Sequence, residues 1–156
     1  MSRVKTWLAS NILLLLTAGA DGKIRIVNAS SQEPVHHFTT EEVVKALLLL
    51  PEQLVVATES GKLLLGALDQ GELESIPGHE KAIVALESHP SAMMQIFTGS
   101  LDGTVKHWEL GENKVVRSIT HGDPVGDLSV SPDGQHLISL SASAAKVWKV
   151  EDGSHL

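Results

Sequence analysis

Short apolar runs alternate with turn signals along the whole chain. An apolar run, a tight turn and a run of alternating polar and apolar residues recur four times. The turns hold Asp-Gly or Ser-Gly pairs, and glycine accepts the positive φ that such turns need. This pattern predicts second strands at 12–17, 54–58, 96–98 and 137–139, and third strands at 23–27, 62–67, 104–108 and 145–148. First strands are predicted at 43–48, 82–86 and 125–130, and fourth strands at 35–38, 73–76 and 115–119.

The pattern repeats with a period of about 40 residues. Val27, Gly66, Trp108 and Trp148 stand at equivalent positions of the third strands. A period of about 40–45 residues is typical of the four-stranded blade of a β-propeller. We therefore expect an all-β fold with four antiparallel blades, at residues 3–38, 42–77, 81–119 and 123–156, the last with an incomplete fourth strand.

Two segments allow another interpretation. Basic Arg3 and Lys5 precede the apolar run 12–16, which is the outline of a signal peptide, but Asn11 interrupts it and the repeat favours a buried strand. Acidic residues 41 and 42 before the run 43–48 could begin a helix, although the register of the repeat favours a strand. The uninterrupted apolar runs are far shorter than the ~20 residues of a membrane-spanning helix.

The third unit resembles the WD-repeat family. It carries Gly78-His79, Thr98, Asp102-Gly103 and Trp108-Glu109 at the spacing of that family. The resemblance implies a buried hydrogen-bond chain through His79, Thr98, Asp102 and Trp108. Such a chain makes physical sense, because a buried indole N–H needs an acceptor and a hydroxyl can accept that bond and donate another.

The other units keep only parts of this set. The partial equivalents are His121, Ser139 and Trp148 in the fourth unit and Thr17 and Asp21 in the first. WD-repeat domains have about seven blades, so the resemblance implies that the four units are part of a seven-bladed ring; a closed smaller ring is the alternative. An open array would expose strand edges and apolar faces, so we expect the isolated chain to self-associate.

Charge and composition exclude several kinds of chemistry. The net charge of −7 disfavours a direct grip on a nucleic acid backbone, and the absence of cysteine excludes disulfides and cysteine-bound metals. Eight histidines are present, but His36 and His37 are adjacent on a predicted strand and would point to opposite faces. A Thr98–His79–Asp102 set could be mistaken for a hydrolase triad, yet it is predicted to lie inside a blade without a substrate cleft. We expect no metal, no cofactor, no membrane association and no catalysis.

Binding is expected at one rim of the propeller. The loops between fourth and first strands and between second and third strands emerge there, and several are acidic. Candidate partner-binding residues are Glu80, Lys81, Leu101 and Asp123. The sequence thus predicts a non-catalytic scaffold that binds other proteins in a multi-subunit complex, with a basic segment as a plausible partner.

A narrower resemblance concerns residues 125–148, in which Ser131-Pro132-Asp133-Gly134 precedes a shortened turn without aspartate. This stretch is similar to the WD-repeat subunit of the transcription-linked subcomplex of the small-subunit processome. The similarity implies a nucleolar protein that assists pre-ribosomal RNA transcription and processing. The alternative is a cytoplasmic WD-repeat adaptor, such as a substrate receptor or a trafficking scaffold.

Overall fold

The structure is a computed structural model that describes residues 3–9, 12–19 and 21–156. The first sheet is formed by β1 (Arg3–Ala9), β2 (Ile12–Ala18), β3 (Lys23–Asn28) and β4 (Pro34–Thr39). The second sheet is formed by β5 (Val44–Leu49), β6 (Gln53–Thr58), β7 (Lys62–Ala67) and β8 (Glu74–Pro77). The third sheet is formed by β9 (Ile83–Ser88), β10 (Gln95–Ser100), β11 (Thr104–Glu109) and β12 (Lys114–Thr120). The fourth sheet is formed by β13 (Asp127–Val130), β14 (His136–Leu140) and β15 (Ala145–Lys149).

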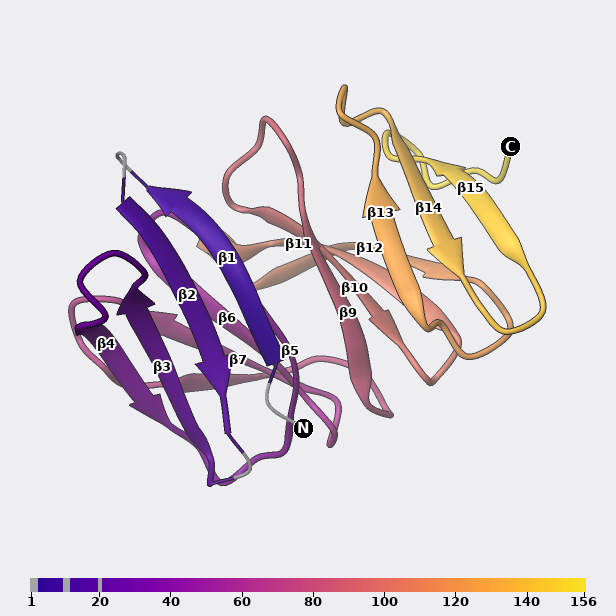
Figure 1. Ribbon diagram of the computed structural model, residues 1–156. Helices are drawn as coiled ribbons and strands as arrows, with labels where there is room; N and C mark the ends of the chain where they lie inside the picture. The colour runs from indigo at the N-terminus through magenta and orange to yellow at the C-terminus, as the bar shows by residue number, and fades with distance from the viewer. Residues whose placement is uncertain (1–2, 10–11, 20) are drawn as a thin grey trace.

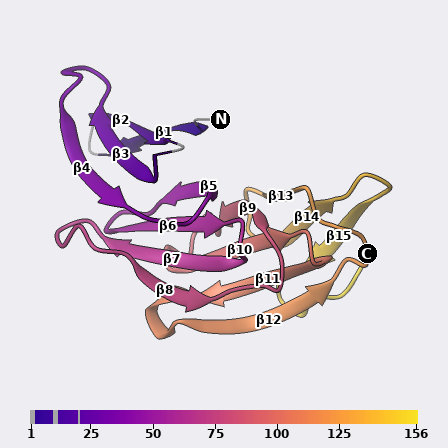
Figure 2. The ribbon, with the colours of Figure 1, turned by 90° about the horizontal axis from the view of Figure 1, so that it is seen from below.

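All four sheets are antiparallel meanders, in which each strand pairs with its neighbour in the sequence. The four first strands are innermost, since β5 lies beside both β1 and β9, and β9 lies beside β13. The sheets follow one another in an arc, with their faces packed together (Figures 1 and 2). This arrangement is part of a β-propeller, so the predicted all-β fold is confirmed. The described part of the chain holds one 3-10 turn (Leu110–Glu112) and no α-helix, so it contains no helix that could cross a membrane.

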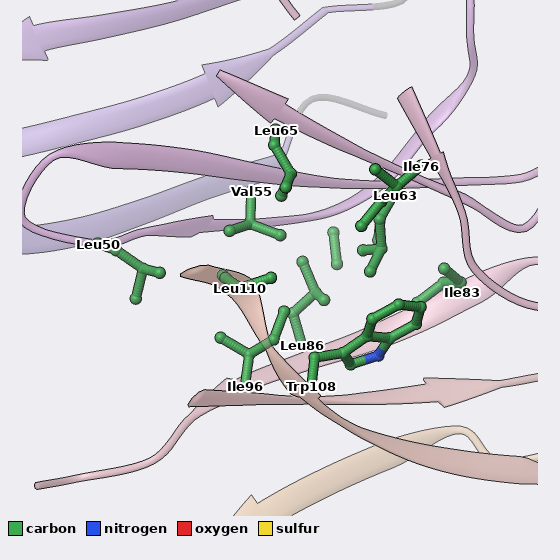
Figure 3. Close-up of a cluster of buried hydrophobic side chains, with 12 residues drawn as sticks. Leu50, Val55, Leu63, Leu65, Ile76, Ile83, Leu86, Ile96, Trp108 and Leu110 are labelled. Carbon is green, nitrogen blue, oxygen red and sulfur yellow. The ribbon is translucent and has the colours of Figure 1, made fainter. Parts of the chain in front are cut away.

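A hydrophobic cluster fills each space between adjacent sheets. Within one strand the side chains alternate between two clusters: Val56 and Leu64 face the first sheet, whereas Val55 and Leu63 face the third. The cluster between the second and third sheets includes Trp108, which is almost fully buried among aliphatic side chains (Figure 3). Each buried aliphatic side chain contributes about 1.5–3 kcal/mol, so these clusters are the main force that holds the sheets together.

Most predicted strands lie within one or two residues of the observed ones. Residues 44–49 form β5 and not a helix, and the apolar run that could have been a signal peptide is β2. The strand predicted at 125–130 begins only at Asp127, because Val125 is fully buried and its N–H donates to the carbonyl of Ser100 in the third sheet. Val125 thus joins two sheets and does not extend β13.

The fourth sheet has three strands, and the chain then turns back along β15. Trp148 forms a bridge with His155, and the N–H of Leu156 donates to the carbonyl of Val147 at 2.9 Å. Residues 155 and 156 therefore lie antiparallel to β15, in the place that a fourth strand takes in the other three sheets.

Candidate protein-interaction rim

A continuous hydrogen-bond chain crosses the third sheet. The indole Nε1–H of Trp108 donates to Thr98 Oγ1 at 2.9 Å, and Thr98 Oγ1 lies 2.7 Å from His79 Nε2. On the other side of the ring, His79 Nδ1 lies 3.0 Å from Asp102 Oδ2. A carboxylate only accepts, so the ring donates from Nδ1 to Asp102 and accepts from the Thr98 hydroxyl at Nε2. All donors along the chain therefore point towards Asp102.

Burial and hydrogen bonding keep His79 and Asp102 each in one protonation state near neutral pH. The His79 side chain is fully buried, and desolvation lowers its pKa although the negative charge of Asp102 acts in the opposite direction. Burial alone would raise the pKa of Asp102. Hydrogen bonds from the side chain and backbone of Thr104, the charge of His79 and the N–H of Glu80 outweigh it and lower the pKa to about 2. Near neutral pH the hydrogen-bond chain therefore contains a neutral imidazole at His79 and ends on a carboxylate at Asp102.

This geometry does not favour a catalytic use of Thr98. Its residue has no exposed surface, and its hydroxyl oxygen is shared between Trp108 and His79. A nucleophile must reach a substrate, whereas this hydroxyl is enclosed between two sheets. The set that resembles a triad by composition therefore has the geometry of a structural lock between strands.

A shorter chain lies in the fourth sheet. Trp148 Nε1–H donates to Ser139 Oγ at 2.8 Å, and Ser139 Oγ lies 2.7 Å from His121 Nδ1. The other ring nitrogen of His121 is buried without a hydrogen-bond partner, because the shortened turn between β14 and β15 has no aspartate at the place of Asp102. Burial lowers the pKa of His121 and keeps its ring neutral.

The first sheet keeps two residues of the motif, Thr17 and Asp21. Thr17 is half-buried in β2, while Asp21 accepts the backbone N–H of Lys23 at 3.1 Å and a guanidinium N–H of Arg25 at 3.3 Å. Those two contacts, the Lys23 N–H first, lower the pKa of Asp21. Thr40 precedes β5 and holds for the second sheet the place that His79 holds for the third, since both backbone N–H groups donate to the glycine carbonyl in the turn of the preceding sheet. The first sheet therefore keeps Thr17 in β2 and Asp21 in the turn before β3, where Asp21 is held by contacts with Lys23 and Arg25 of its own sheet.

In the second and fourth sheets, the carboxylate that joins the loop to the turn comes from the loop and not from the turn. Ser60 stands at the turn position of Asp102, and its hydroxyl donates to Glu42 in the preceding loop at 2.7 Å. Ser143 does the same in the fourth sheet and donates to Asp123. In the third sheet the acid lies in the turn; in the second and fourth the turn holds serine and the loop supplies the acid. Each loop is therefore joined to its turn through one carboxylate.

Three further side chains act at this rim that were not among the residues predicted from the sequence. The Thr104 hydroxyl donates to Asp102 Oδ1 at 2.6 Å, and the ammonium groups of Lys106 and Lys146 donate to the loop carbonyls of Gly78 and His121. The two lysines stand two residues before the two tryptophans. This spacing is a sequence signal for the lysine contacts, because residues two apart on a strand share a face and the lysines therefore lie on the same face as Trp108 and Trp148.

The predicted partner-binding residues lie at the outer surface of this end of the sheets. Glu80, Lys81 and Asp123 are exposed, and Leu101 is an exposed apolar residue in the turn between β10 and β11. The backbone N–H of Glu80 donates to Asp102 Oδ2, and this hydrogen bond fixes the loop that carries the exposed Glu80 carboxylate. We call the four residues Glu80, Lys81, Leu101 and Asp123 the rim patch.

Among the described residues, no group of three or more His, Asp or Glu side chains could hold a metal. His36 is half-buried and its neighbour His37 is exposed on β4, as alternation along a strand requires.

The arrangement at this end of the sheets provides fixed loops with exposed polar and apolar tips.

Comparison with known proteins agrees with this geometry. Residues 71–109 and 113–149 each match the family "WD domain, G-beta repeat" (WD40). Each match begins near the outer strand of one sheet and ends in the third strand of the next sheet. The two matches contain both complete Trp-hydroxyl pairs, Trp108 with Thr98 and Trp148 with Ser139.

Several curated proteins are similar to this chain over different lengths. The target of rapamycin complex subunit wat1 of Schizosaccharomyces pombe is 27% identical over 150 residues, which is 91% of this chain and 47% of wat1. The DDB1- and CUL4-associated factor 13 of Dictyostelium discoideum is 32% identical over 81 residues, 49% of this chain and 18% of that protein. The bovine U3 small nucleolar RNA-associated protein 15 homolog is 39% identical over 59 residues, 38% of this chain and 11% of that protein. The chain thus spans less than half the length of each of these relatives, and it contains WD40 repeats.

Proposed function

We propose that the chain is a four-blade part of a WD-repeat β-propeller, and that it acts as a non-catalytic scaffold for other proteins. The four blades are residues 3–38, 42–77, 81–119 and 123–156. The observation that carries the proposal is the rim, where buried hydrogen-bond chains fix the loops while their tips stay exposed. A surface whose loops are already ordered loses little conformational entropy when it binds a partner.

The rim patch is the proposed contact surface. Leu101 supplies an apolar anchor, and Glu80 and Asp123 supply negative charge beside it. The net charge of −7 favours a partner with a basic segment, through long-range attraction that salt weakens. WD-repeat relatives that are named as subunits of complexes support a role in assembly.

A matched pair of substitutions tests the rim patch. Leu101→Asp should reduce recovery of bound proteins when the full-length protein is purified from cells by affinity. Val116→Asp is the control, because Val116 is exposed to a similar degree but lies within the outer strand β12, away from the rim loops. Equal recovery with both variants would reject the rim patch as the contact surface.

We place the scaffold in ribosome biogenesis, as a nucleolar subunit of the small-subunit processome. Two observations support this placement: the shortened turn after residues 131–134, and 39% identity to a U3 small nucleolar RNA-associated protein homolog. An adaptor in a signalling complex is the second candidate, because the similarity to a target of rapamycin complex subunit covers 91% of the chain.

The same purification distinguishes the two candidates. Enrichment of U3 small nucleolar RNA and nucleolar proteins with the full-length protein would support the processome. Enrichment of a kinase complex or of ubiquitin-ligase subunits without U3 RNA would reject the processome and favour the adaptor.

A further inference from the structure

A second surface lies at the opposite end of the sheets from the rim patch. A cleft of about 460 Å³ opens there between the second and third sheets, where the turn before β6 meets the loop before β10. Its lining includes Leu50, Glu52, Gln53, Met93 and Met94. We call it the methionine cleft.

Backbone hydrogen bonds hold both walls of the methionine cleft. The N–H of Leu50 donates to the carbonyl of Gln53 at 2.8 Å and closes the turn that forms one wall. The N–H of Leu110 donates to the carbonyl of Met94 at 2.9 Å and attaches the other wall to the 3-10 turn after β11. The cleft is therefore present before any ligand binds.

The side chains in the cleft favour an aromatic ligand. Met93 is 68% exposed and Met94 is 40% exposed, although both are apolar. Methionine adapts its shape to a partner, and its sulfur makes favourable contacts with the edges of aromatic rings. Covering the two side chains would also remove apolar surface from water.

One polar atom of a lining residue lacks a hydrogen-bond partner, and it adds a second requirement for the ligand. Gln53 Oε1 is buried and has no hydrogen-bond partner. An amide oxygen can only accept, so the group that satisfies it must donate a hydrogen bond. Gln53 lines the cleft, and rotation about the terminal torsion of glutamine is soft, so binding through this oxygen requires the amide to turn towards the cleft.

We propose that the methionine cleft binds a tryptophan side chain of a partner protein. The indole is apolar and aromatic, and it carries one N–H donor and no acceptor, which suits two methionines and one unpaired oxygen. Glu52 is exposed at the edge of the cleft and favours a lysine or arginine beside that tryptophan.

Short peptides test the proposal against the full-length protein. The probes are acetyl-Lys-Trp-Lys-amide, acetyl-Lys-Phe-Lys-amide and free indole. Binding is followed by NMR of methionine methyl groups, with Met93 and Met94 assigned through M93L and M94L. We expect both assigned signals to shift with the tryptophan peptide, and its affinity to exceed that of the phenylalanine peptide by about fivefold, the effect of one hydrogen bond.

A variant of the acceptor separates the hydrogen bond from the apolar contact. Gln53→Leu should remove the preference for tryptophan over phenylalanine and leave the phenylalanine peptide bound, with the unfolding midpoint measured to show that the variant is folded. Retention of the preference in this variant would overturn the proposal, as would the absence of shifts at Met93 and Met94. Free indole that binds as tightly as the tryptophan peptide would overturn the assignment to a partner protein.

Discussion

Phe38 occupies the space that a side chain at Gly66 would need. A β-carbon placed on Gly66 would lie 2.7 Å from Cε1 of Phe38, which is closer than real contacts allow. Gly66 stands in the second sheet at the position that Trp108 holds in the third. The ring of Phe38, from the first sheet, therefore fills the place that corresponds to the Trp108 indole of the third sheet.

We expect Gly66→Ala to destabilise the protein by about 1–3 kcal/mol, because an added methyl group overpacks a filled core. Phe38→Leu should lower stability on its own, since it removes buried volume, but it should relieve the clash in the double variant. The coupling between the two substitutions is measured by urea unfolding in a double-mutant cycle. Additive effects would show that the two sites do not share this space.

The shared hydroxyl of the third sheet gives a second prediction. Thr98→Val keeps the shape of the side chain but leaves the Trp108 N–H and His79 Nε2 buried without a partner. We expect a loss of about 2–4 kcal/mol, one desolvation penalty for each orphaned group. Thr98→Ser is the control and should cost less, since Ser139 serves the same role in the fourth sheet. A loss with serine as large as that with valine would assign the effect to packing.

Buried histidines predict a loss of stability in weak acid. Desolvation lowers the pKa of His79, His107 and His121 below the ordinary value of 6.5. Below pH 6.5 the unfolded chain binds protons that these folded histidines do not, so the free energy of unfolding falls as the pH drops. His107→Leu should reduce the slope of stability against pH between 7.5 and 5, and His37→Asn, on the exposed face of β4, should not.

A separate loss is expected at lower pH from Asp102. Its pKa is about 2 in the folded protein and 3.8 ordinarily, so it stabilises the fold above pH 3.8 and that stability is lost as the pH falls towards 2. The difference corresponds to about 2 kcal/mol. Asp102→Asn should remove this acid transition when unfolding is followed by circular dichroism; an unchanged transition would contradict the inferred role of the carboxylate.

The third sheet has its acid in the turn, whereas the fourth sheet has serine in the turn and its acid in the loop. This difference predicts an effect of charge on stability. Ser143→Asp would put a second carboxylate beside Asp123 and should destabilise the fourth sheet modestly, by about 0.5 kcal/mol. Adding Asp123→Ser should restore stability, because the double variant has the arrangement of the third sheet, with the acid in the turn. High salt should weaken the effect of the single variant; an effect that does not depend on salt would show that charge is not its cause.

The outward face of the fourth sheet predicts self-association of the isolated chain. Ile138 and Leu140 are each 40% exposed on β14, on the face opposite to buried Leu137 and Ser139. Replacing Ile138 and Leu140 with lysine should shift sedimentation velocity profiles towards the monomer. A monodisperse monomer without these substitutions would contradict the expectation.

Much of this structure follows from patterns that are local in the sequence. Apolar runs between glycine turns predict the strand positions, and residues at family spacing, such as His79 and Trp108, indicate the set that the third sheet brings together. The pairing of Ser60 with Glu42 has no such motif, because it depends on where a loop lies above a turn 18 residues away. The methionine cleft combines loops of two sheets, and only packing of those sheets brings Gln53 near Met94.

The meander topology also affects how the protein can fold. Every strand pairs only with strands that immediately precede or follow it, so each sheet closes through short loops. The strands of one sheet can therefore pair as soon as their own stretch has left the ribosome, and the sheet is stabilised when the next sheet docks on its apolar face. Synthesis would extend the arc from its amino-terminal end, and a pause between two blades would leave the apolar face of the newest sheet exposed until its neighbour is made.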